Sequence, residues 1–162
     1  MAHPGVRMRV IGCGSAVRGD DAAGLLVARR LRELGIPARE VEGELTAVLD
    51  AFEGSQDVLL VDAMAGGGRV GSVRSWDGLP AGMRRRAGTS SHGLGVAEAL
   101  DLARALGRLP RRVRIYGIEA GRVDPGGAVS PAVAAAVEKL ARRIAARWAG
   151  RGARRRGLAR RR

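Results

Sequence analysis

The stretch RVIGCGSAVRGDDAAGLLVARRLREL, residues 9–34, decides the fold. It begins inside a strand-forming run at residues 7–12 and continues through a glycine-rich loop into a predicted helix at residues 20–34. One face of that helix carries four apolar side chains: Ala23, Val27, Leu31 and Leu34. A strand that leads through a loop into an amphipathic helix is the first part of a β-α-β unit. The stretch therefore predicts a parallel sheet covered by helices.

Strands and helices continue to alternate along the rest of the chain. We expect strands at residues 38–42, 58–61, 72–76 and 113–118, and helices at residues 45–52, 94–106 and 130–148. The strand at residues 58–61 is entirely apolar, as is typical of a buried parallel strand, and we expect it to stop at Asp62. The strand at residues 72–76 is expected at the edge of the sheet. This order predicts an α/β fold, a three-layer α/β/α single domain with a mostly parallel twisted sheet.

The length and composition fit one domain. A chain of 162 residues has room for a single core, which we place in residues 1–149. Hydrophobic residues make up 46% of the chain but aromatic residues only 2%, so the core consists mainly of Ala, Val, Leu and Ile. Such a core suits helices packed on a sheet.

The basic charge is concentrated at the C-terminal end. The net charge is +13, but seven of the 29 Lys and Arg residues lie in residues 150–162, which contain no acidic residue. Without these seven, 22 basic residues face 16 acidic ones, a surplus of 6. We expect residues 150–162 to form a solvated, disordered Arg-rich tail. A nucleic-acid partner is not expected, because no aromatic residue is interleaved for base stacking.

The cysteine count and the hydropathy pattern bear on the compartment. The single cysteine, Cys13, excludes an internal disulfide, and no apolar run approaches the ~18 residues of a membrane span. The N-terminus leads almost directly into a strand and lacks a signal-peptide pattern. We therefore expect a cytoplasmic protein without membrane insertion.

The glycine-rich loop at residues 12–21 does not fit a nucleotide site. The dinucleotide-binding pattern requires a third glycine where this chain has Val17. A phosphate-binding loop fits the glycine spacing, but Asp20 and Asp21 occupy its Lys and Ser/Thr positions. Carboxylates there repel phosphates, so the loop suits cations. We expect Asp20 to cap the helix, where an acidic residue gains ~0.3 to 1 kcal/mol from the dipole, and Asp21 to be functional.

Three potential metal ligands fall at the ends of predicted elements. Asp21 stands at a helix start, Asp62 at a strand end, and His92 in a loop that leads into the next helix. Ligands bind outside the carboxyl ends of the strands in such sheets, so these side chains are expected to converge. Two carboxylates and one imidazole form an open ligand set for a divalent cation.

Nucleophilic alternatives are weaker. Ser90 and Ser91 adjoin His92, but neither lies in the G-x-S-x-G turn that exposes a catalytic serine. A Cys13–His92 pair is conceivable, although a cysteine at this place in a strand-end turn is more often a small packed residue. Glu119 is either a supporting group near the site or a surface turn residue. Residues 84–86, three arginines, either dock a partner or form a solvated face.

Four motifs occur in order along the chain: Gly12-Cys13-Gly14 with residues 18–24, Val61-Asp62-Ala63, Ser91-His92-Gly93-Leu94-Gly95, and Tyr116-Gly117-Ile118-Glu119. At these spacings they resemble the hydrogenase maturation endopeptidases, which trim the C-terminus of nickel-iron hydrogenase large-subunit precursors. The resemblance covers residues 8–148. It differs at Ser15, where the family usually has Asn.

The resemblance implies a site and an activity. Asp21, Asp62 and His92 match the family's nickel-ligand positions, so they are the expected catalytic and metal-binding residues, with nickel carried by the precursor. The implied activity is that of an aspartic-type or metal-dependent endopeptidase that removes the C-terminal extension of the nickel-loaded precursor. The implied fold is phosphorylase/hydrolase-like. The alternative is a noncatalytic nickel-sensing maturation chaperone that recognises the metal without cutting.

Overall fold

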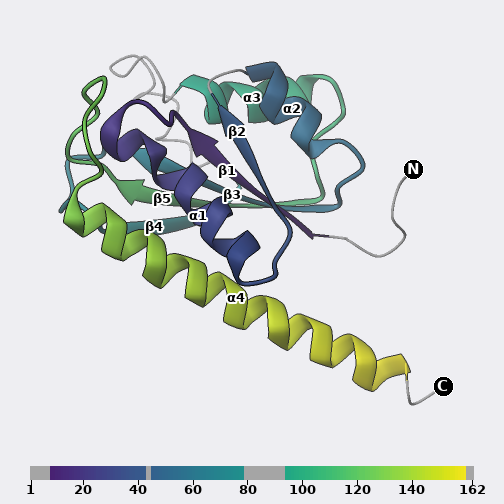
Figure 1. The fold of residues 1–162 in the computed structure, drawn as a ribbon. Helices are drawn as coiled ribbons and strands as arrows, with labels where there is room; N and C mark the ends of the chain where they lie inside the picture. Colours follow the sequence, from purple (N-terminus) through teal and green to yellow (C-terminus); the bar gives the residue numbers. More distant parts are fainter. Residues whose placement is uncertain (1–7, 43–44, 79–93, 160–162) are drawn as a thin grey trace.

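The computed structural model describes residues 8–42, 45–78 and 94–159. In these residues five strands form one sheet in the order β2-β1-β3-β5-β4 (Figure 1). The strands are β1 (Met8–Gly14), β2 (Ala38–Glu42), β3 (Asp57–Met64), β4 (Val73–Asp77) and β5 (Arg112–Glu119). Strands β1, β2, β3 and β5 are parallel, and β4 pairs antiparallel with β5 at the edge. The predicted mostly parallel sheet is therefore confirmed, including its edge strand.

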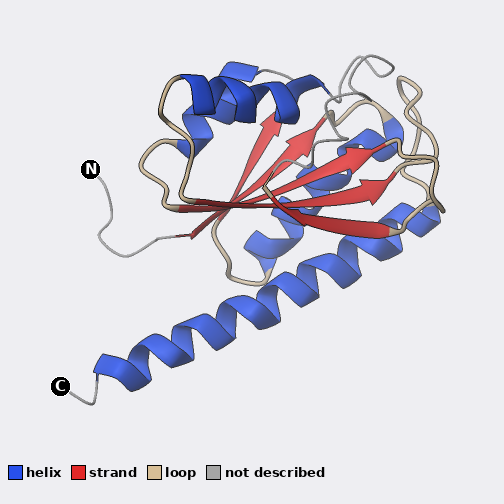
Figure 2. Ribbon diagram, turned by 180° about the vertical axis from the view of Figure 1, so that it is seen from behind, coloured by secondary structure: helices blue, strands red, loops and turns tan. Residues whose placement is uncertain are grey.

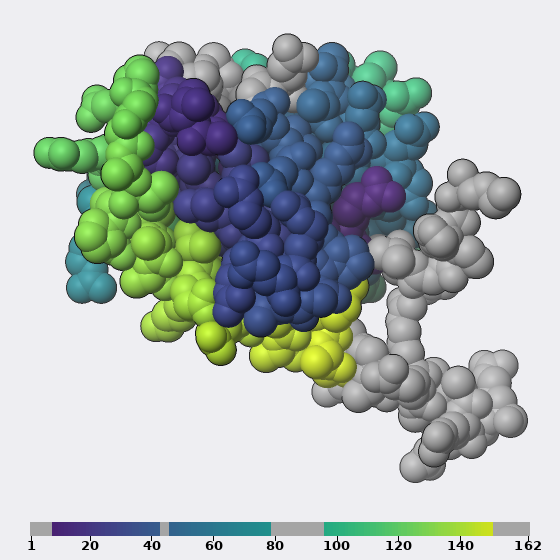
Figure 3. Space-filling model, viewed as in Figure 1, coloured from purple at the N-terminus to yellow at the C-terminus, as the bar shows by residue number. Residues whose placement is uncertain are grey.

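Helices cover both faces of the sheet. The helical segments are η1, a short 3-10 turn (Gly19–Ala22), α1 (Ala23–Glu33), α2 (Leu45–Phe52), α3 (Leu94–Ala105) and α4 (Pro131–Ala159). Helices α1 and α4 pack together on one face, while α2 and α3 pack together on the other (Figure 2). The space-filling view shows α1 and α4 side by side on the first of these faces (Figure 3). The three-layer α/β/α arrangement is thus confirmed.

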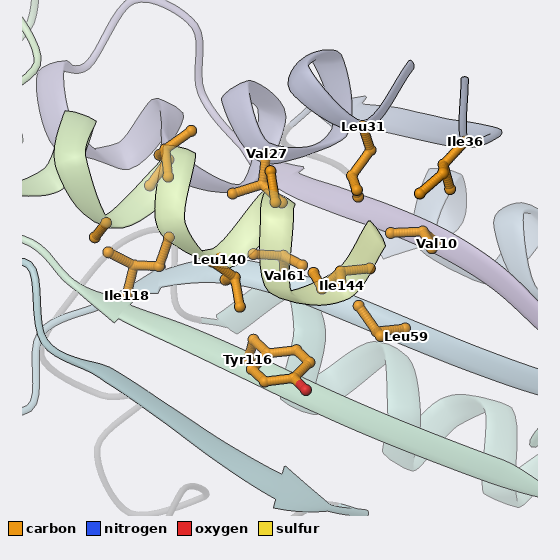
Figure 4. Packing of buried hydrophobic residues seen from close by; sticks show 14 of the residues in the cluster. Val10, Val27, Leu31, Ile36, Leu59, Val61, Tyr116, Ile118, Leu140 and Ile144 are labelled. Atoms are coloured by element: carbon orange, nitrogen blue, oxygen red, sulfur yellow. The ribbon is translucent and has the colours of Figure 1, made fainter. Parts of the chain in front are cut away.

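Side chains alternate along each strand between two cores. On β3, Leu59 and Val61 face α1 and α4, whereas Val58 and Leu60 face α2 and α3. The close view of the first core shows Leu59 and Val61 beneath Leu140 and Ile144 of α4 (Figure 4). Burying a side chain of this size stabilises the fold by about 1.5–3 kcal/mol. Residues 58–61 are apolar throughout because helices cover both faces of the strand.

Two strands extend beyond their predicted ends. The expectation that β3 stops at Asp62 is wrong, because the strand continues to Met64. Strand β5 also runs further than residues 113–118 and pairs with β3 as far as Met64 and Glu119. Each strand supplies hydrogen-bond partners for the backbone groups of the other along their full length, so both strands end together. The hydrophobic pattern of β3 alone does not reveal this pairing.

Helix α4 is longer than predicted. It begins at Pro131, where the sequence places its first residue, but it continues to Ala159 and not to about Trp148. Most of residues 150–162, expected to be disordered, therefore continue the helix, which extends past the body of the domain (Figure 1). Ala, Arg and Leu favour helix, whereas Gly150, Gly152 and Gly157 each cost only about 1 kcal/mol. The assignment of the domain to residues 1–149 stays a prediction.

Four α-helices and one 3-10 turn lie in the described part of the chain. None of them combines the length and the apolar composition that crossing a membrane requires.

Candidate active site

Asp21 and Asp62 lie at the carboxyl edge of the sheet, which we define as the edge where β1, β2, β3 and β5 end. Asp21 belongs to η1, directly after β1, and Asp62 lies near the end of the neighbouring strand β3. From β1 the chain crosses through α1 to β2 on one side, whereas β3 lies on the other side. This divergence makes the space between β1 and β3 the topological switch point, where ligands bind in open α/β sheets.

Glycines bring η1 and α1 very close to the strand ends. A Cβ atom on Gly24 would lie 2.1 Å from the Cys13 carbonyl oxygen and 2.3 Å from that of Val61. A Cβ atom on Gly14, whose φ is +151°, would lie 2.0 Å from the Asp21 carbonyl oxygen. The glycines of the loop therefore allow close backbone packing. They hold Asp21 at the ends of β1 and β3.

Asp62 carries its charge in unfavourable surroundings. Its Oδ1 atom accepts a hydrogen bond of 2.8 Å from the Ala63 N–H. Burial raises the pKa of Asp62 well above its usual range, and the negative charge of Asp21 raises it further. The backbone hydrogen bond from Ala63 opposes these effects but does not outweigh them. Asp21 and Asp62 therefore interact as two like charges. This agrees with the expectation from the sequence that the two side chains converge.

Asp20 has a different role from the helix cap that the sequence predicts. It is fully buried, and Oδ2 accepts hydrogen bonds from the N–H groups of Gly121 and Arg122 at 2.8 and 3.0 Å. Ser130 donates to Oδ1 through its N–H at 2.6 Å and to Oδ2 through its hydroxyl at 2.9 Å. Burial alone would raise the pKa of Asp20, but these hydrogen bonds lower it below the usual value. The cap interpretation is wrong, because the partners lie in a distant segment.

Glu119 is buried at the same edge, with 2% of its surface exposed. It is the last residue of β5 and pairs with Met64. Its Oε1 atom accepts a hydrogen bond of 2.7 Å from the Gly66 N–H, and Oε2 lies 4.0 Å from Arg74 Nη2. The alternative of a surface turn residue is therefore wrong. Glu119 ties the segment after β3 to the end of β5, which fits the supporting role considered from the sequence.

Cys13 behaves as a packed core residue. It is a free cysteine, 5% exposed, in the core beneath α2 and α3. Burial raises the pKa of its thiol well above the usual value, and the negative charge of Asp62 adds to the effect. The thiol stays protonated at neutral pH, so it is a poor nucleophile.

His92 lies outside the described residues, as do Ser90, Ser91 and residues 84–86. The described chain resumes at Leu94, where α3 begins. The C-terminal end of α3 leads into the start of β5, at the amino edge of the sheet. The N-terminal end of α3 therefore lies toward the carboxyl edge. Within the described ranges, no three His, Cys, Asp or Glu side chains form a group that could hold a metal ion. The trio of Asp21, Asp62 and His92 thus stays a prediction, of which the structure brings the first two together.

The fold and the family-model match together define an enzyme of the protease class. Residues 44–147 match the family model described as hydrogenase maturation protease. The chain belongs to the hydrogenase maturation protease family. This confirms the resemblance that the four sequence motifs carry.

Solved structures show the same fold. The NiFe hydrogenase maturation protease HybD from Thermococcus kodakarensis is 28% identical, with a TM-score of 0.71 over 88% of this chain and 99% of that one. An endopeptidase from Escherichia coli is 22% identical, with a TM-score of 0.74 over 90% and 94% of the two chains. The E. coli hydrogenase maturating endopeptidase HybD is 20% identical, with a TM-score of 0.70 over 91% and 94%. At these lower identities the two E. coli proteins support the fold alone. No curated protein matches this sequence.

Proposed function

We propose that this protein is the endopeptidase that removes the C-terminal extension of a nickel-loaded NiFe hydrogenase large-subunit precursor. The observation that carries the proposal is the interacting pair of Asp21 and Asp62 at the switch point of the sheet. The family and the similarity to a NiFe hydrogenase maturation protease support the choice of substrate. A cytoplasmic location is part of the proposal, in keeping with the free thiol of Cys13.

Nickel belongs to the substrate in this proposal. The negative charge of Asp21 raises the pKa of Asp62, and such a pair binds a divalent cation readily, because the cation replaces the repulsion by attraction. An imidazole from His92 would complete a mixed oxygen and nitrogen ligand set suited to a transition metal. The nickel of the precursor would therefore guide the precursor's C-terminal segment to the carboxyl edge of the sheet.

The same residues would then assist hydrolysis. Binding the nickel fixes the adjacent peptide bond in one orientation, which converts an encounter of two molecules into a reaction within one complex. A water molecule attacks the carbonyl carbon, the C–N bond breaks, and the leaving amine takes up a proton. The raised pKa of Asp62 makes its carboxylate a stronger proton acceptor, which suits a group that accepts and returns that proton. No covalent intermediate with the enzyme is involved.

The decisive experiment mixes the purified protein with nickel-loaded precursor and follows the precursor by intact mass spectrometry. We expect one loss of mass at the C-terminus, and no loss with nickel-free precursor. Stable binding without shortening would contradict the endopeptidase and favour the nickel-sensing chaperone. Cleavage of casein at a comparable rate would contradict recognition through the metal.

A further inference from the structure

We propose that Asp20 is a positioning residue, which sets the place of Asp21 by anchoring η1 to the segment between β5 and α4. The inference rests on the proposed function for its role in catalysis. Its structural part stands on the hydrogen bonds of Asp20 alone.

The anchor joins two parts of the chain that lie far apart in sequence. Within the described residues, the Asp20 carboxylate accepts four hydrogen bonds, from Gly121, Arg122 and Ser130, which are 101 to 110 residues away. Two backbone bonds of 2.7 Å run alongside them, from the Asp20 N–H to the Arg122 carbonyl and from the Gly126 N–H to the Val17 carbonyl. The space-filling view shows the two segments side by side, one purple and the other green (Figure 3).

The 3-10 turn η1 depends on such outside contacts. It contains only four residues, Gly19–Ala22, and a single turn of this kind has little stability of its own. A Cβ atom on Gly19 would lie 2.7 Å from the Arg122 carbonyl oxygen, so the segment after β5 packs in direct contact with the turn. Asp21 follows Asp20 in that turn, so the contacts that fix the position of the turn also fix the position of Asp21.

Asp20 itself is unsuited to bind the substrate. An ionised carboxylate offers about four acceptor positions, and all are used here. The side chain is also fully buried. Its contribution therefore passes through Asp21, and a displacement of about 1 Å in a reacting group costs on the order of 100-fold in rate.

The test compares Asp20→Asn with Ser130→Ala and with Ile144→Val. In Asp20→Asn, an NH₂ group replaces one of the two carboxylate oxygens. This NH₂ group is a donor and faces another donor, so hydrogen bonding is lost at that position. Ser130→Ala removes only the hydroxyl bond. Ile144→Val is the matched control, since it loosens the core under α4 without touching the anchor. Each variant is measured well below its melting temperature, and the rate is expressed per folded molecule.

We expect Asp20→Asn to process nickel-loaded precursor at least about 10-fold more slowly per folded molecule, Ser130→Ala to lose about 3-fold, and Ile144→Val to keep the full rate. Hydrogen exchange of residues 15–22 should accelerate in the first two variants and not in the control. This second measurement needs no substrate, so it separates the anchor from the proposed function. A full rate per folded molecule in Asp20→Asn, or unchanged exchange of residues 15–22 in both Asp20→Asn and Ser130→Ala, would overturn the proposal. If Asp20→Asn does not fold, Ser130→Ala carries both measurements.

Discussion

The two ends of the sheet hold acidic side chains under opposite conditions. At the amino edge, where β1, β3 and β5 begin, Arg114 donates to Asp77 through Nε and Nη2 at 2.8 and 3.1 Å. This pairing lowers the pKa of the exposed Asp77. At the carboxyl edge, Asp21 and Asp62 repel each other and the pKa of Asp62 is raised. The first arrangement is that of an ordinary solvated surface, whereas the second costs stability and so indicates a function.

Asp77 also lies at a hollow in the surface. A pocket of about 110 Å³ lies at the amino edge, and its lining includes Asp57, Asp77, Arg112 and Arg147. Neither Asp21 nor Asp62 lines it. The two carboxylates of the candidate site are therefore separate from this pocket.

The largest expected effect is the loss of processing when one of the three proposed nickel ligands is replaced. Asp21→Asn, Asp62→Asn and His92→Gln should each reduce cleavage of nickel-loaded precursor to less than about 1% of wild type, because the metal-bound bond is no longer oriented. Mass spectrometry of the precursor measures the rate, and circular dichroism confirms folding. Normal processing by any one variant would remove that residue from the site.

Glu119→Ala tests whether the hydrogen bond between Glu119 and the Gly66 N–H stabilises the carboxyl edge. We expect a loss of about 1–3 kcal/mol in the free energy of unfolding, because the Gly66 N–H loses its buried acceptor. Urea denaturation followed by circular dichroism provides the value. Glu119→Gln, which can keep the acceptor oxygen, is the matched control and should lose less. Equal stability of Glu119→Ala and wild type would show that the contact is dispensable.

Asp62→Asn should stabilise the metal-free protein at neutral pH. The folded-state pKa of Asp62 is raised above its unfolded value of about 3.9, so the wild type loses stability as the pH rises from about 4 through the folded-state pKa. The gain of the variant should therefore be absent below about pH 4 and grow as the pH rises. Thermal melts in the presence of a chelator measure it, and each kcal/mol relieved corresponds to roughly 2–4 °C. A variant that melts below wild type at pH 7 would contradict the repulsion.

The smallest effect is expected at the amino edge. Asp77→Asn breaks an exposed ion pair with Arg114, and such pairs contribute little in water. Melting temperature and processing rate should both match those of wild type within experimental error. A clear loss of activity would show that the two ends of the sheet are not functionally distinct.

The sequence predicted the layers of the fold well because they depend on local patterns. Strand β2 and helix α2 have the predicted bounds, and the alternation of strands and helices leads to the observed sheet. Glycine and acid spacing also placed Asp21 and Asp62 at one edge. These features rest on periodicity and on the rule that parallel strands end at a common edge.

Features that depend on distant partners were not predictable in this way. The role of Asp20 required knowledge of where Gly121 and Ser130 lie, and no local pattern contains it. The length of β3 depended on its pairing with β5. Helix α4 continues past Trp148 because helix propensity outweighs three glycines, whereas the charge pattern suggested disorder.

The contact of Gly24 with both strand ends has a consequence for anyone who redesigns this enzyme. An added Cβ atom would lie 2.3 Å from the Val61 carbonyl oxygen, whereas ordinary contacts begin at 3.4 Å, so the start of α1 would have to move away from the strand ends. The positions of Asp21 and Asp62 thus depend on Gly24 having no Cβ atom. A redesign of the carboxyl edge should therefore change the side chains around it and leave Gly14 and Gly24 as they are.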